Sequence, residues 1–116
     1  MSDSLQEIQE LAEKLGDAIA RNPRFLALRD AEKAVDADPS AKELLKKYNE
    51  KTMAILQKED SLLPVEPEEK RDLMKLRADV ARNGILQALN KAQADYSEMM
   101  NRVNRSVFDK LGVKPD

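Results

Sequence analysis

Apolar residues recur three or four positions apart along almost the whole chain, and this spacing is the strongest constraint on its fold. Such a spacing places side chains on one face of an α-helix, whereas a half-buried strand needs strict alternation of apolar and polar residues. The first stripe consists of Leu5, Ile8, Leu11, Leu15 and Ile19. The chain is therefore predicted to fold as a set of amphipathic helices, in the all-α class.

The composition favours the same class and points to association between chains. Ala, Glu, Lys, Leu and Arg make up 60 of the 116 residues, but only 34 residues are Leu, Val, Met, Ile, Phe or Tyr. Burying a large side chain gains roughly 1.5–3 kcal/mol and ordering a residue costs about 1–2 kcal/mol, so a thin bundle benefits from burying surface against another chain. We expect one helical-bundle domain over residues 1–116 that forms a homodimer or higher oligomer.

Proline marks the boundaries between the predicted helices. Asn22-Pro23 ends the first helix, because proline disfavours a helical residue before it and suits the first turn of a new helix. Asp38-Pro39 repeats this arrangement, with Asp38 as the cap of a third helix that ends near residue 60. The segment 61–67 contains two prolines and is predicted to be a connection. Its three aliphatic residues either cover one end of the bundle or form a docking patch.

Two short signals indicate the outer ends of the helical region. Ser4 and Glu7 have the spacing of a capping box, in which each side chain satisfies the other's free backbone N–H. Gly112 follows the last apolar position, and glycine is a natural helix stop there. The first helix is thus expected to begin at Ser4, and the last is expected to end near Leu111.

The last predicted helix, residues 68–111, lacks proline and carries the longest apolar stripe. The stripe slips at Asn83-Gly84, where Gly84 indicates either a bend or the close approach of another helix. From Ile85 to Val103 the spacing alternates four and three, the heptad rhythm of a coiled coil. The stripe is explained by a core alone, or by a core that extends into an oligomer or partner interface. The candidate interface residues are Ile85, Leu89, Tyr96, Met99, Met100, Val103 and Val107.

The residue types present exclude most kinds of catalytic site. The chain has no His and no Cys, which removes imidazole bases, thiol nucleophiles, disulfides and the ordinary zinc and iron–sulfur sites. Its three glycines lie far apart, so there is no phosphate-binding loop, and no Ser-x-x-Lys pattern occurs. Helix capping explains the acidic residues near positions 36–38 and 66–69 better than a divalent metal ion does. We therefore expect no catalytic residue, no metal and no cofactor, and a protein that is not an enzyme.

Charge and hydropathy argue against nucleic-acid and membrane binding. The formal net charge is -2, acidic residues interrupt the basic positions of the last helix, and four aromatic residues are too few for a stacking platform. RNA binding through the basic side of that helix is a third alternative for the function, and a solvated helix face explains the same residues. No apolar run approaches the roughly 20 residues of a membrane helix, and the first residues lack the regions of a leader peptide. We expect a cytoplasmic protein.

Several segments resemble the YlbF/YmcA family, small all-helical bacterial proteins linked to control of competence, sporulation and biofilm formation. The resemblance extends over about residues 5–111 and rests mainly on the order of breaks and helix lengths. The segments that carry it are residues 12–19, the motif Asn22-Pro23-Arg24-Phe25, residues 31–35, residues 38–45, and the long last helix with Asn83, Ile85 and Tyr96.

The resemblance implies a non-enzymatic helical bundle that self-associates and binds other proteins, in some members within a complex that modulates RNA processing by an endoribonuclease. Some of those complexes carry iron–sulfur clusters on cysteines, which this chain does not contain. The sequence thus predicts a bundle of three to five helices with a long C-terminal helix and coiled-coil-like packing. Its predicted function is regulation or scaffolding through helix-mediated protein contacts and self-association. The alternative is a helical chaperone or adaptor that holds client proteins.

Overall fold

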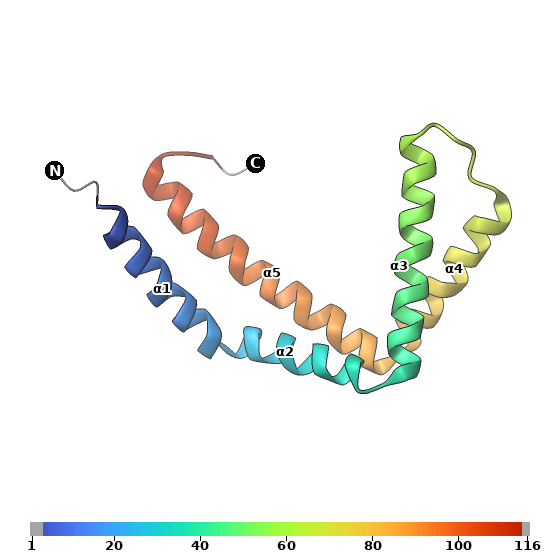
Figure 1. Ribbon diagram of the computed structural model, residues 1–116, viewed down its shortest axis with the longest axis horizontal. Coiled ribbons are helices and arrows are strands. Elements are labelled where there is room, and N and C mark those ends of the chain that lie inside the picture. Colours follow the sequence, from blue (N-terminus) through green and yellow to red (C-terminus); the bar gives the residue numbers. More distant parts are fainter. Residues whose placement is uncertain (1–3, 115–116) are drawn as a thin grey trace. The chain divides into compact units, whose positions relative to one another are not determined.

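The computed structural model describes residues 4–114 and forms α-helices over most of that range. The helices are α1 (Leu5–Arg21), α2 (Pro23–Asp36), α3 (Pro39–Asp60), α4 (Pro67–Arg82) and α5 (Gly84–Leu111), as Figure 1 shows. Residues 4–114 contain no strand and their longest helix is the last one, which confirms the predicted all-α class. None of the helices in this described range is long and apolar enough to cross a membrane.

The predicted proline boundaries are confirmed, and side chains stabilise them. The Asn22 side chain accepts a hydrogen bond from the Arg24 backbone N–H at 2.8 Å, at the start of α2. The Asp38 carboxylate accepts one from the Ala41 N–H at 3.0 Å, which makes it the predicted cap of α3. Gly112 follows α5 with a φ of 71°, a left-handed conformation that glycine adopts without a steric penalty.

The region predicted as one helix over residues 68–111 is two helices separated at Asn83. This residue has an extended conformation, with φ −85° and ψ 115°. Its side-chain oxygen accepts hydrogen bonds from the backbone N–H groups of Ile85 at 3.0 Å and Leu86 at 3.1 Å. A Cβ placed on Gly84 would meet no atom of the described chain within 4 Å, so no close approach of a helix requires glycine here. The break therefore follows from Asn83, which acts as an N-cap.

The predicted capping box at the start of α1 is wrong. Ser4 has a left-handed conformation, with φ 60° and ψ 16°, and its side chain makes no capping hydrogen bond. An N-cap side chain reaches the first free N–H groups from an extended backbone, which Ser4 does not have. Only the Ser4 carbonyl takes part in the helix, accepting a hydrogen bond from the Ile8 N–H at 3.2 Å.

The contacts within the chain divide it into two compact units. The first unit consists of residues 1–30 and 92–116, and the second consists of residues 31–91. Both α2 and α5 continue from one unit into the other. Almost all of the described buried core belongs to the second unit. Its buried side chains are those of Ala31, Val35, Ala41, Ile55, Leu86 and Leu89.

Within the second unit, α3 and α4 pack side by side as a helical hairpin (Figure 1). Ile55 of α3 is buried, and two ion pairs join the helices beside it. One pairs Lys58 with Glu69, and the other pairs Lys51 with Asp72 at 3.8 Å. The hairpin thus combines a small apolar contact with charged partners along its edge.

Candidate interaction surface

The structure places the predicted interface residues of α5 at very different depths. Leu89 is only 7% exposed, so the single chain already covers it as part of the core. Val107 is 49% exposed and is available to another molecule. The half-buried members of the set are Ile85, Tyr96, Met99, Met100 and Val103. The stripe therefore changes along α5 from covered side chains near Leu89 to open ones near its C-terminal end.

Tyr96 of this stripe contacts the start of α2 within the first unit. The rings of Phe25 and Tyr96 lie with their centroids 6.1 Å apart and their planes tilted by 47°. The Arg29 guanidinium lies 5.7 Å from the centroid of the Phe25 ring, which is cation–π distance. An offset aromatic pair contributes about 0.5–1.5 kcal/mol beyond its burial, so this contact ties α2 to α5.

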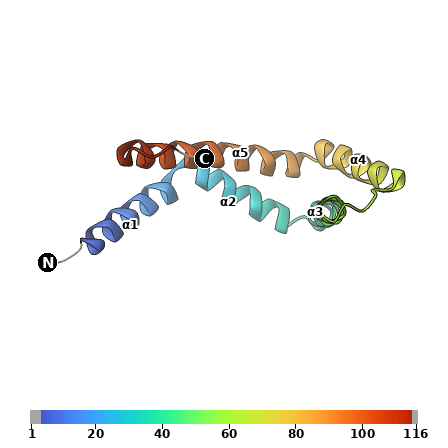
Figure 2. The same cartoon turned by 90° about the horizontal axis from the view of Figure 1, so that it is seen from above.

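The apolar stripe of α1 is largely uncovered in the described chain. Leu5, Ile8, Leu11 and Leu15 are between 41% and 61% exposed, and α1 has no buried residue. Ile19, at the end of the same stripe, is half-buried. The first turns of α1 diverge from α5, the other long helix of this unit (Figure 2). Most of the stability of a helix in a protein comes from packing of its amphipathic face, so this face calls for a covering partner.

The sequence predicts this stripe but did not place it in the candidate interface. Amphipathic spacing shows which side of a helix is apolar, and it does not show what covers that side. The low number of large apolar residues could have indicated this surface, because so few residues cannot cover every stripe within one chain. Leu11 and Leu15 therefore join Val107 as candidate contact residues.

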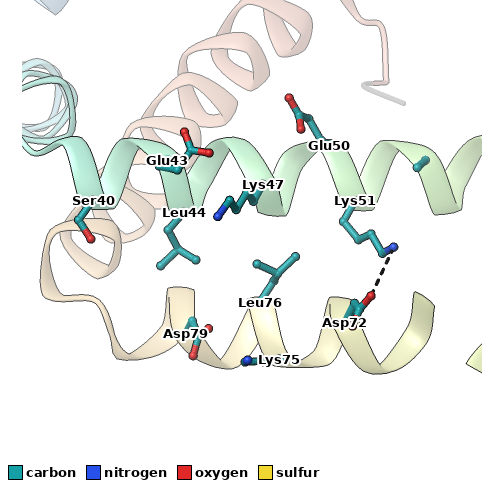
Figure 3. A pocket seen from close by; sticks show the side chains of 11 residues that line it. Ser40, Glu43, Leu44, Lys47, Glu50, Lys51, Asp72, Lys75, Leu76 and Asp79 are labelled. Carbon is teal, nitrogen blue, oxygen red and sulfur yellow. Dashed lines mark ion pairs between the residues drawn. The ribbon is translucent and has the colours of Figure 1, made fainter. Parts of the chain in front are cut away.

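The α3–α4 hairpin presents an open groove of about 840 Å³ (Figure 3). Leu44 and Leu76 supply its apolar part, and Lys51 lies across from Asp72 in an ion pair. The remaining charged side chains along the groove alternate in sign. They are Glu43, Lys47, Glu50, Lys75 and Asp79. Because neither sign predominates, the groove has no evident preference for an anionic or a cationic ligand.

The connection between α3 and α4 exposes its apolar residues instead of covering a core. Leu62 is 93% exposed and has a φ of 58°, a left-handed conformation that is unfavourable for a residue with a Cβ. Its backbone still closes α3, because the Leu63 N–H donates to the Lys58 carbonyl at 2.8 Å. Val65 is the one half-buried aliphatic residue of this described connection.

Three of the five acidic residues considered as metal ligands have other partners. Asp38 caps α3, and Asp36 pairs with Lys42 at 3.8 Å. Glu69 pairs with Lys58, and the hydrogen bond from that ammonium lowers the pKa of the Glu69 carboxyl below its usual value. Among residues 4–114, no three carboxylates are grouped so that they could hold a metal ion.

The geometry is thus that of a helical protein with exposed apolar helix faces, and comparison with known proteins gives its family. A family described as control of competence regulator ComK, YlbF/YmcA, matches residues 8–112, nearly the whole chain. The chain belongs to the YlbF/YmcA family. The predicted resemblance is therefore confirmed, and with it the link to a family associated with competence regulation and not known as an enzyme family.

Two curated relatives of this YlbF/YmcA protein come from lactobacilli. A UPF0342 protein of Lactobacillus helveticus is 26% identical over 99 residues, which cover 85% of each chain. A UPF0342 protein of Lactobacillus acidophilus is 25% identical over 99 residues, again 85% of each chain. The names of these relatives describe no ligand or partner, so the function rests on the family and on the surfaces of this chain.

Proposed function

We propose that this YlbF/YmcA protein is a non-enzymatic regulator or scaffold of the bacterial cytoplasm, acting through helix-mediated contacts with other proteins and through self-association. The observation that carries the proposal is the exposed apolar stripe of α1, together with the open end of the α5 stripe at Val107. Apolar side chains at helical spacing are the anchors by which one helix lies against another protein. Charged side chains around those anchors select the partner.

Affinity capture of tagged protein from lysate of its native host, with and without ribonuclease, tests this function. One nuclease-resistant partner at near-stoichiometric yield would support the regulator. Many sub-stoichiometric clients would instead support a chaperone or adaptor, and loss of the captured material on nuclease treatment would support RNA binding.

A matched pair of variants makes the capture specific to the α5 surface. Val107→Asp places a charge on the open end of the stripe, where the side chain is 49% exposed and its change leaves the core intact. Ser106→Asp introduces the same charge on the neighbouring position, outside the stripe. We expect Val107→Asp to lose the captured partner and Ser106→Asp to keep it. Equal capture by both variants would contradict a role for this surface.

The half-buried part of the stripe gives a second test by oligomeric mass. Tyr96→Asp or Val103→Asp should disrupt assembly, because either change puts a charge into the predicted contact. Tyr96 also packs against Phe25, so the Val103 variant separates assembly from folding more cleanly. A Val103→Asp protein that kept both its oligomeric mass and its melting temperature would rule out this interface.

A further inference from the structure

We infer that a second copy of this chain covers the exposed stripe of α1, with α1 of each copy lying antiparallel against the C-terminal half of α5 of the other. This inference rests on the proposed self-association and specifies which surfaces make it. It begins from the observation that Leu5, Ile8, Leu11 and Leu15 remain 41–61% exposed in the single chain. Their stripe is long, continuous and free of charged residues, as a helix-packing face is.

The same unit contains a matching open face at the end of α5. Val107 is 49% exposed, Leu111 is 65% exposed, and Val113 beyond the helix is 52% exposed. The chain therefore presents two uncovered apolar surfaces of similar kind, one at each end of its sequence. Two copies related by a two-fold axis can cover both at once, because each contact is then made twice.

The charges along the two helices favour the antiparallel pairing. Residues 5–13 of α1 carry three carboxylates and no cation, while residues 14–21 carry two cations and one carboxylate. Residues 92–101 of α5 carry two carboxylates and no cation, while residues 102–111 carry three cations and one carboxylate. An antiparallel arrangement therefore brings the acidic half of each helix beside the basic half of the other. A parallel arrangement would place like charges together along the whole contact.

The size of the surface is sufficient for a stable dimer. Each copy contributes the 17 residues of α1 and the 20 residues of α5 from 92 to 111. If about half of them face the partner, the contact involves on the order of 20 residues a side, near the lower end of specific interfaces. The antiparallel helix dipoles also attract each other, which adds to the preference in direction.

Single-cysteine cross-linking tests the pairing directly, because the chain has no cysteine of its own. Ile8→Cys, Val107→Cys and Met99→Cys proteins are mixed in pairs and treated with a short bismaleimide, so that every product joins two copies. The antiparallel pairing predicts that position 8 joins position 107 more readily than it joins position 99 or a second position 8. A dominant product of position 8 with position 99, or with itself, would overturn this pairing.

Sedimentation equilibrium separates failure of this inference from failure of self-association. We expect Leu11→Asp to raise the dissociation constant of the dimer by roughly 100-fold or more, since it places a charge in an apolar contact. Gln9→Asp, two residues away and outside the stripe, should change it by less than about threefold. An unchanged mass for Leu11→Asp in an oligomeric protein would overturn the role of α1 and leave self-association standing. A monomeric wild-type protein at all concentrations would overturn both.

Discussion

The two compact units of this chain differ in how completely each covers its own apolar residues. The second unit, residues 31–91, buries Ile55 and Leu86 among its helices. The first unit, residues 1–30 and 92–116, leaves Leu5, Ile8, Leu11 and Leu15 of α1 exposed. Its α2 and α5 segments meet at the ring pair of Phe25 and Tyr96. The second unit thus buries apolar side chains within one chain, whereas for the first unit we propose that another molecule covers the exposed stripe.

The largest expected effect comes from opening the core of the second unit. Leu86 is 2% exposed, so Leu86→Ala should lower the free energy of unfolding by about 2–5 kcal/mol, through lost burial and the cavity left behind. Urea unfolding followed by circular dichroism measures this change. Met74→Ala is the matched control, since Met74 is 66% exposed and its loss should cost less than about 0.5 kcal/mol. Equal losses for the two variants would remove the distinction between core and surface in this unit.

A change in the first unit should instead depend on protein concentration. Leu15→Ala removes a side chain that is 41% exposed in the single chain and that the proposed association would cover. We expect the free energy of unfolding to fall by about 1–2 kcal/mol in concentrated solution and by close to nothing in dilute solution. The reason is that the side chain contributes only where the copies are associated. Thermal unfolding over a wide range of concentrations measures the difference. A loss that stays constant over that range would mean that α1 is covered within its own chain.

The boundary between α4 and α5 should respond to loss of the Asn83 cap. Asn83→Ala removes the acceptor for the Ile85 and Leu86 N–H groups and should cost about 1 kcal/mol. Asn83→Asp keeps an acceptor and should remain close to the wild type in urea unfolding. An alanine variant as stable as the wild type would show that Gly84, and not the cap, sets the break.

A smaller effect of opposite sign is expected at the tip of the α3–α4 hairpin. Leu62→Gly should raise the stability by about 0.5 kcal/mol, since relief of the left-handed strain exceeds the entropy cost of glycine. The side chain is 93% exposed, so little packing is lost. Leu63→Gly is the control, because Leu63 has no positive φ, and it should be neutral or destabilising. Thermal unfolding distinguishes the two, and a destabilised Leu62→Gly protein would indicate a contact at the tip.

The smallest expected effect is on how the stability of the α3–α4 hairpin depends on pH. Lys58 lowers the pKa of Glu69, so the pair stabilises the folded state above the ordinary carboxyl value of 4.5. This contribution is lost as the pH falls through the lowered pKa of the folded state. The unfolding midpoint in urea should decline as the pH falls from about 5 to about 3, and Lys58→Gln should make this decline less steep. Lys46→Gln should leave the decline as steep as in the wild type. A steeper decline in the Lys58→Gln variant would mean that the Lys58–Glu69 pair does not stabilise the folded state in this way.

Much of the fold follows from local sequence signals, and the exceptions have local causes. Proline at positions 23, 39 and 67 sets helix starts because its geometry suits the first turn and disfavours a helical residue before it. The break at Asn83 has no proline, so the sequence predicted either a bend or a close helix approach at Gly84, whereas the structure has a break capped by Asn83. At Ser4 the capping residues are present, but the backbone is left-handed and the cap does not form.

The candidate surface was harder to predict than the helices. The spacing of Leu5, Ile8 and Leu11 predicts an apolar face, and so does the spacing of Tyr96 and Val103. Which of these faces meets a neighbour depends on long-range packing. Helical periodicity carries no information about that packing. The sequence therefore predicts the candidate interface on α5, with the connection over residues 61–67 as an alternative docking patch. The exposed fractions of α1 lead us to propose that α1 takes part as well.

Hydrogen–deuterium exchange at two protein concentrations tests the central difference between the units most directly. Backbone amides of α3 and α4 should show the same protection in dilute and concentrated solution, because their contacts lie within one chain. Amides of α1 should be protected in concentrated solution and exchange at least about tenfold faster on dilution, as the covering copy leaves. Protection of α1 that does not change with concentration would contradict the proposal that a second copy covers this helix.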